Sequence, residues 1–114
     1  MRAIEGDKLR GHLETIILSV LERGEAHGLE ILRRLDEAGY GLLHLKEGSL
    51  YPALYRLEEA GKVQAVWEEE PHGRRGARRR IYHLTTKGKR ELAKGREEWT
   101  SFVQVVGGIL GATA

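Results

Sequence analysis

Residues 71–90 hold the side chains of this sequence that are best suited to binding a polyanion. The stretch carries eight Lys or Arg residues and no Asp or Glu, whereas the rest of the chain holds the other 11 basic residues and all 17 acidic ones. Cationic groups gathered without carboxylates are typical of a surface that neutralises phosphates. A merely solvated loop is the alternative, but the absence of acids favours binding. The candidate phosphate contacts here are Arg74, Arg75, Arg78, Arg79 and Arg80.

Other kinds of chemistry find little support. Without cysteine the chain has no disulfide, no thiolate nucleophile and no thiolate metal ligand, and its five histidines lack the i, i+4 pairing of a zinc site. No nucleophile is clustered with a base, and no phosphate loop follows a strand, so we expect no enzyme activity, no cofactor and no metal. No apolar run approaches the roughly 18 residues that span a bilayer, and the first residues lack a signal-peptide core. We therefore expect a cytoplasmic protein that does not engage a membrane.

The pattern of apolar residues predicts the elements that position the basic groups. Spacings of three and four predict helices over residues 7–23, with Asp7 as the cap, and over residues 28–38. A short connection over residues 40–46 could include a fragment of strand. The period then changes to two, which predicts a β-hairpin over residues 62–84. The apolar face expected for the second helix comprises Leu29, Ile31, Leu32 and Leu35.

A third helix, from Leu50 to Gly61, is predicted to have two different faces. If Ser49 caps this helix, Pro52 lies in the first turn, where its missing N–H has no intrahelical partner. The sequence does not decide whether Tyr51 points inward or outward, because the residue before a proline is itself constrained. The buried stripe comprises Leu50, Ala53, Leu54 and Leu57. The surface that these residues leave free comprises Ser49, Tyr51, Pro52, Tyr55 and Arg56.

The last helix, capped by a threonine within residues 85–86, carries a heptad-like apolar stripe. Leu92, Trp99 and Val106 are seven residues apart, and other apolar residues fill the alternate positions. The stripe could pack back on the first helix. We favour an interface between two chains, because apolar stripes of this size are rarely left in water. The predicted interface residues are Leu92, Trp99, Phe102, Val103, Val106 and Ile109.

Three helices followed by a hairpin with a basic tip are the order of a winged helix-turn-helix. The predicted fold is mainly α with a small β-hairpin, in which residues 1–85 form the winged domain and residues 86–114 a C-terminal dimerisation helix. In this arrangement the third helix enters the major groove of DNA and the hairpin, or wing, contacts the backbone or the minor groove. Arg56 could reach a guanine, and the hydroxyl groups of the third helix could bond phosphates, as could the wing arginines. Alternatively, Arg56 pairs with Glu59 or Glu47 on its own helix.

Three segments resemble the PadR family of bacterial transcriptional regulators. They read LRGHLETIILSVLERGEAHGLEIL, EGSLYPALYRLEEAGKV and RRRIYHLTTKGKREL, and the similarity covers about residues 8–103. The most distinctive motif joins Gly48, Leu50, Tyr51, Pro52, Leu54, Arg56, Leu57, Glu58 and Gly61. A second motif, at the end of the wing, joins Arg80, Tyr82, Leu84, Thr85 and Gly88. The single terminal helix is similar to the smaller PadR subclass.

The resemblance implies a homodimer that is held by the C-terminal helix and binds a palindromic operator on double-stranded DNA. It also implies a repressor that a small molecule releases from DNA. In multidrug-sensing members an aromatic residue on this helix stacks on flat ligands, and Trp99 matches its position; the alternative is that Trp99 is interface core. The turn Ala26-His27-Gly28-Leu29 departs from the family pattern, which has an aromatic residue there. A competing hypothesis is a winged-helix protein-interaction module that binds no nucleic acid.

Overall fold

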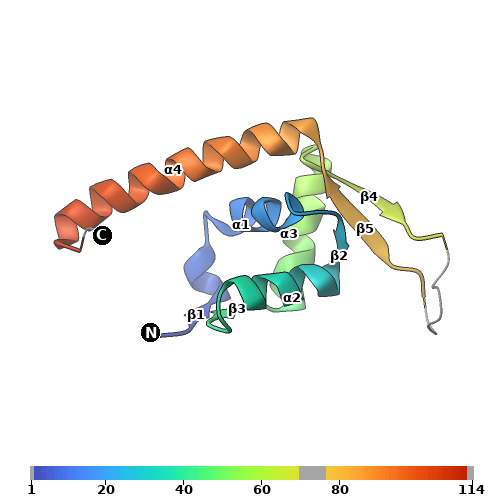
Figure 1. The fold of residues 1–114 in the computed structure, drawn as a ribbon, viewed down its shortest axis with the longest axis horizontal. Coiled ribbons are helices and arrows are strands. Elements are labelled where there is room, and N and C mark those ends of the chain that lie inside the picture. Colours follow the sequence, from blue (N-terminus) through green and yellow to red (C-terminus); the bar gives the residue numbers. More distant parts are fainter. Residues whose placement is uncertain (1, 70–76, 113–114) are drawn as a thin grey trace.

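The computed structural model describes residues 2–69 and 77–112 of the chain (Figure 1). Three helices precede a two-stranded wing, and a long fourth helix follows it, which confirms the predicted winged helix-turn-helix. In chain order the elements are β1 (Ile4–Glu5), η1 (Gly6–Leu9), α1 (Leu13–Leu21), β2 (Ala26–His27), α2 (Gly28–Ala38), β3 (Leu43–His44), α3 (Glu47–Glu59), β4 (Val63–Trp67), β5 (Arg80–Leu84) and α4 (Thr86–Leu110).

The first helix is shorter than predicted, because the chain turns before it. Residues 6–9 form the 3₁₀ helix η1, and Gly11 adopts a φ of 90°, which a continuous helix does not allow. Helix α1 therefore begins at Leu13 after His12, and Asp7 is not its cap. Leu9 is nevertheless buried. Because Leu9 fits the three- and four-residue spacing of the apolar residues in α1, the sequence of η1 and α1 resembles a single helix.

Helix α2 has the predicted bounds but not the whole predicted apolar face. Ile31 and Leu35 are buried, whereas Leu29 is 50% exposed. Positions 29 and 31 are about 200° apart around a helix, so the side that buries Ile31 turns Leu29 outward. The expectation that Leu29 belongs to the core is therefore wrong.

Two small sheets tie the wing and the N-terminal arm to the helices. In the wing, β4 and β5 are antiparallel, with Val63 opposite Leu84 and Trp67 opposite Arg80. Strand β2 pairs with the other edge of β5, which fixes the wing to the segment that leads into α2. The second sheet pairs β1 with β3 in parallel. Strand β3 confirms the strand fragment expected within residues 40–46.

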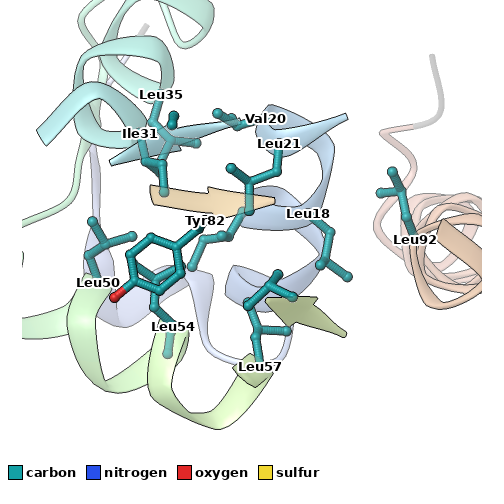
Figure 2. Close-up of a cluster of buried hydrophobic side chains, with 14 residues drawn as sticks. Leu18, Val20, Leu21, Ile31, Leu35, Leu50, Leu54, Leu57, Tyr82 and Leu92 are labelled. Atoms are coloured by element: carbon teal, nitrogen blue, oxygen red, sulfur yellow. The ribbon is translucent and has the colours of Figure 1, made fainter. Parts of the chain in front are cut away.

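The core lies where α1, α2 and α3 meet the wing (Figure 2). Tyr82 of β5 inserts its ring among the side chains of the three helices, and Leu92 brings the first part of α4 to the same cluster. The buried stripe of α3 is the one that its spacing predicts. The largest completely buried side chains are Ile17, Ile31, Leu50, Leu54, Leu57, Val63 and Leu92.

Helix α4 begins as a covered helix and ends as an uncovered one. The Thr85 hydroxyl accepts a hydrogen bond from the Gly88 N–H at 3.0 Å, which confirms the threonine cap. The next turns pack on α1, where Arg96 Nη2 lies 2.8 Å from Glu22 Oε1. Farther on, α4 extends past the rest of the chain, at the opposite end of the molecule from the wing (Figure 1). None of the helices in the described ranges combines the length and apolar character needed to cross a lipid bilayer.

Candidate nucleic-acid interface

Helix α3 presents a polar surface directly opposite its buried stripe. Tyr51 is 41% exposed and Tyr55 is 65% exposed, and Ser49, Pro52 and Arg56 are exposed as well. Leucines on the other side of the helix fix its position against α1 and α2. The two tyrosine hydroxyls, the serine and the guanidinium are hydrogen-bond donors that nucleic acid could meet on a rigid support.

The start of α3 differs from the prediction and changes the role of Pro52. Lys46, in extended conformation, precedes the helix, and its carbonyl accepts hydrogen bonds from the N–H groups of Ser49 and Leu50. Ser49 is therefore inside the helix, and Pro52 lies in the second turn, so both first-turn expectations are wrong. The N–H that would ordinarily reach the Gly48 carbonyl does not exist. Because Gly48 is exposed, water can satisfy that carbonyl.

Tyr51 lies across the beginning of α2. Gly28, the first residue of α2, is buried beneath its ring, and a Cβ atom at position 28 would lie 2.6 Å from the Tyr51 Cζ. A side chain there would push the ring away. Tyr51 is thus partly packed and partly exposed, which answers the question of its orientation. It lines a cavity of about 200 Å³ shared with His27, Gly28, Leu29, Arg78, Arg79, Arg80 and Tyr82.

Arg56 pairs with a different carboxylate from those predicted. Its Nε lies 3.4 Å from the Glu14 Oε2 on α1, rather than near Glu59 or Glu47 on its own helix. Both side chains are well exposed, and exposed pairs of this kind contribute about 0.2–1 kcal/mol. A phosphate or a guanine could therefore replace Glu14 at little cost.

The wing arginines fall into different environments. Arg74 and Arg75 lie outside the described residues. Arg78 is exposed. Arg79 donates its backbone N–H to Glu68 Oε1 at 3.0 Å and places Nη1 3.1 Å from the His27 Nε2. Arg80 donates from Nη2 to Glu58 Oε2 at 2.6 Å. Of the three arginines in the described part of the wing, Arg78 is therefore the exposed one, whereas Arg79 and Arg80 are partly buried and paired.

His27 is a member of this surface that sequence reasoning missed. Its Nδ1 accepts a hydrogen bond from the Glu30 N–H at 3.2 Å, so it caps α2, while its other ring nitrogen faces Arg79. The position directly before the first residue of a helix is the available signal, because residues with an acceptor side chain are favoured there. Its contact with the wing arises from the β2–β5 pairing. A strand of only two residues is too short to be predicted from the sequence pattern.

The apolar side of α4 forms a second candidate surface. Phe102 is 48% exposed and Ile109 is 79% exposed, with Trp99, Val103 and, in part, Val106 along the same side. Leu110, which widens the predicted stripe, is exposed too, as is Val105, which was not predicted. Leu92 is a correction: it is 1% exposed and belongs to the core of its own chain, because α4 still packs on α1 at that point.

Trp99 lies in an aromatic cluster between α4 and the segment before α1. Its ring stacks with Phe102 at 5.9 Å and 18°, and meets the His12 ring edge-on at 5.1 Å. An adjoining cavity of about 690 Å³ is bounded by Trp99, α1 and the N-terminal arm, and its lining includes Arg2, Lys8 and Arg96 but no carboxylate. In the described ranges no group of three or more His, Asp or Glu side chains could hold a metal ion.

Comparison with known proteins agrees with this geometry. Residues 17–94 match the Transcriptional regulator PadR-like family. A solved transcriptional regulator from Clostridium thermocellum is 33% identical with a TM-score of 0.81, over 90% of this chain and 97% of that one. A PadR family transcription regulator from Clostridium difficile R20291 is 32% identical with a TM-score of 0.74, over 88% and 99% of the two chains.

Two curated proteins show the same similarity by sequence. An uncharacterized protein of Lysinibacillus sphaericus is 27% identical over 90% of this chain and 92% of its own length. The transcriptional regulator YqjI of Escherichia coli is 31% identical over 77% of this chain. The matched region spans 39% of YqjI, so the similarity concerns only one part of that protein.

Proposed function

This chain belongs to the PadR-like family of transcriptional regulators, and from that premise we propose that it is a ligand-responsive repressor that binds a palindromic operator as a homodimer. Residues 1–85 would bind DNA and residues 86–114 would join the two chains. A protein with this task would reside in the cytoplasm. The observation that carries the proposal is the exposed polar face of α3 beside a wing with exposed cationic charge.

The roles of the α3 residues follow from where they lie. Arg56 and Tyr55 stand on the exposed face and are suited to a base edge and a phosphate, respectively. Ser49 and Pro52, nearer the helix start, would lie against the backbone. Tyr51 would present its hydroxyl beside the wing, with Arg78 as the exposed cation of that cavity. Arg74, Arg75 and Arg79 would add cationic charge along the wing.

A DNA duplex selected from random sequence provides the test. Its dissociation constant is measured by fluorescence anisotropy at several KCl concentrations, beside a scrambled duplex of equal length. Replacing Arg56 with glutamine should weaken the selected duplex by about 1–3 kcal/mol and the scrambled one far less, because a base contact is lost. Replacing Gln104, on α4, with alanine is the matched control and should change neither. A wild-type protein that prefers no duplex at low salt would favour the protein-interaction module.

The dimer is proposed from the uncovered half of α4. Its apolar side chains continue in one stripe beyond the part of α4 that packs on α1. A second copy of the same helix offers a matching stripe. Trp99, Phe102, Val103, Val106 and Ile109 would lie in this interface. Such an arrangement also places two α3 helices on one assembly, as a palindromic operator requires.

A flat aromatic effector is proposed to bind beside Trp99. The stacked pair of Trp99 and Phe102 offers an aromatic face, and the adjoining cavity has a cationic and carboxylate-free lining. We therefore choose 2-naphthoate as the probe. Quenching is measured in Trp67→Phe protein, in which Trp99 is the only tryptophan, and release of the selected duplex is measured with the wild-type protein. Saturable quenching together with release is the expected result. Quenching without release would leave Trp99 as a binding residue and remove the effector role.

A further inference from the structure

Arg80 is held by two groups at the loop-side end of the β4–β5 ladder. Its Nη2 donates to the Glu58 Oε2 at 2.6 Å, and its guanidinium carbon lies 5.7 Å from the centre of the Trp67 ring. Trp67 is also the residue opposite Arg80 in the β4–β5 ladder. Glu58 belongs to α3, so the three side chains connect the recognition helix to both strands of the wing. We call Glu58, Arg80 and Trp67 the wing brace.

In the wing brace, the Arg80 guanidinium contacts a carboxylate and an aromatic ring at the same time. One of its nitrogens pairs with a carboxylate, and its central carbon lies over an aromatic ring, which is the combination that favours arginine over lysine. The Arg80 Nε is buried and has no acceptor among the described residues. The Arg80 side chain as a whole is 41% exposed, so what sets it apart from a free phosphate ligand is its engaged Nη2 and buried Nε rather than full burial. Arg78, two residues earlier, is exposed as such a ligand should be.

Moving Arg80 onto DNA would leave a charge uncompensated. The Glu58 side chain is only 28% exposed, and the departure of its partner would leave a half-buried anion close to a polyanion. By contrast, Glu14 is 39% exposed and its contact with Arg56 is looser, at 3.4 Å. The two acid–arginine pairs on α3 are therefore different: the Glu14 pair can open on DNA, whereas the Glu58 pair is built to stay closed.

We propose that Arg80 is a positioning residue, which sets the angle of the wing against α3 through Glu58 and Trp67 so that the exposed wing cations meet the DNA backbone in register. This inference rests on the proposed DNA binding. It reassigns Arg80 from a phosphate contact to a support of the contacts, and it gives Glu58, an acid, a favourable role in binding a polyanion. An acidic side chain ordinarily weakens binding to a polyanion by charge repulsion. A favourable effect of Glu58 would therefore distinguish the wing brace from a simple charge effect.

Two glutamine variants test whether Glu58 strengthens or weakens DNA binding. Glu58→Gln should weaken binding of the selected duplex by roughly tenfold, an effect typical of coupled neighbours, although it removes a negative charge. Glu14→Gln is the matched control and should leave affinity unchanged or strengthen it, because it removes the same charge and frees Arg56. Both are measured well below the melting temperature, so that only folded protein is compared. Stronger binding by Glu58→Gln, or a lowered melting temperature with unchanged affinity, would overturn the brace.

The salt dependence separates a phosphate contact from a support. Arg78→Gln should reduce the slope of log affinity against log salt by about 0.9, the value for one phosphate. Arg80→Gln should weaken binding while keeping the wild-type slope, and Arg80→Gln with Glu58→Gln should cost no more than either change alone. A slope reduced equally by Arg78→Gln and Arg80→Gln would overturn the assignment.

Trp67 gives a readout that does not depend on DNA. The sequence has two tryptophans, so Trp67 is the only one left in Trp99→Phe protein. Its emission should shift when either Arg80 or Glu58 is replaced with glutamine. An unchanged emission would count against the brace. If the wild-type protein binds no duplex, the proposed function and the role of Arg80 in it both fail. If it binds DNA and Glu58→Gln binds equally well, only the brace fails.

Discussion

At the scale of single residues, Tyr40 carries backbone strain. Among the described residues it is the one non-glycine position with a left-handed backbone, at φ 55°, and its side chain is exposed in the turn between α2 and β3. That conformation costs a residue with a Cβ atom roughly 1–2 kcal/mol. The side chain is not part of the core, so the strain is not compensated by packing.

Replacing Tyr40 with glycine should therefore stabilise the protein. The relief of strain is offset by the larger freedom of glycine in the unfolded chain, about 0.5–1 kcal/mol, so a net gain of about 0.5–1 kcal/mol is expected. Urea denaturation measures it. Gly41→Ala, at a φ of 73° in the same turn, is the matched control and should destabilise. A loss of stability on Tyr40→Gly would show that the exposed ring makes a stabilising contact.

The residues of the candidate site illustrate what local pattern can and cannot predict. The spacing of leucines was sufficient to separate the buried from the exposed side of α3. It could not identify Glu14 as the partner of Arg56, because the two lie 42 residues apart, nor Glu58 as the partner of Arg80. Tyr51 stayed undecided for the same reason, since Gly28, which makes room for its ring, is on another helix.

At the scale of elements, α4 packs tightly against α1 at Gly95. A Cβ atom at this position would lie 2.7 Å from the Thr15 Cγ2. Gly95→Ala should therefore lower the free energy of unfolding by about 1–3 kcal/mol, the usual cost of overpacking. Thr15→Ala should restore most of it in the double variant, because the obstructing atoms are removed.

The control for Gly95 lies in the same helix. A Cβ atom at Gly108 would meet nothing within 4 Å, so Gly108→Ala should raise stability by about 0.5–1 kcal/mol through helix propensity alone. Thermal and urea unfolding of the two variants should thus move in opposite directions. Equal shifts would mean that α4 does not pack on α1 at Gly95 as closely as described.

The same helix pair should be sensitive to acid. The hydrogen bond from Arg96 is the main cause that lowers the pKa of Glu22 from its ordinary value of 4.5. Because the folded pKa lies below the unfolded one, the pair stabilises the fold above about pH 4.5, and this contribution disappears as the pH falls further. The melting temperatures of wild type and Glu22→Gln should differ at pH 7 and converge in acid, and added salt should reduce the difference. In protein that already carries Arg96→Gln, Glu22→Gln should produce a smaller difference at pH 7.

Sequence periodicity predicted some elements correctly and missed others. Helix α2, the hairpin and the threonine cap of α4 were predicted because each carries a strong local signal. The start of α1 was wrong because Leu9 stays in the apolar rhythm across the turn at Gly11. Strand β2 has only two residues and exists because β5 offers it an edge, so no periodicity could reveal it. Leu92 was assigned outward because the contact of α4 with α1 depends on how the whole chain folds.

At the scale of the whole molecule, the apolar half of α4 predicts the state of assembly. Phe102→Glu would place an unpaired charge in the middle of the proposed interface, and we expect monomers in sedimentation velocity at micromolar concentration. Gln104→Glu adds the same charge to the same helix two residues away, on another side, and should remain dimeric. A wild-type protein that sediments as a well-folded monomer would refute the interface. A dimeric Phe102→Glu would place the interface elsewhere.

The division of α4 into a covered and an uncovered half also bears on gene dosage. Leu92 anchors the first half in the core of its own chain, so we expect that a lone chain can fold before it meets a partner. If pairing then depends on the second half alone, the concentration of DNA-competent protein at low copy number rises with the square of the number of chains in the cell. A twofold change in synthesis would become a nearly fourfold change in operator-binding species. The length of one exposed helix would thus set a threshold for repression.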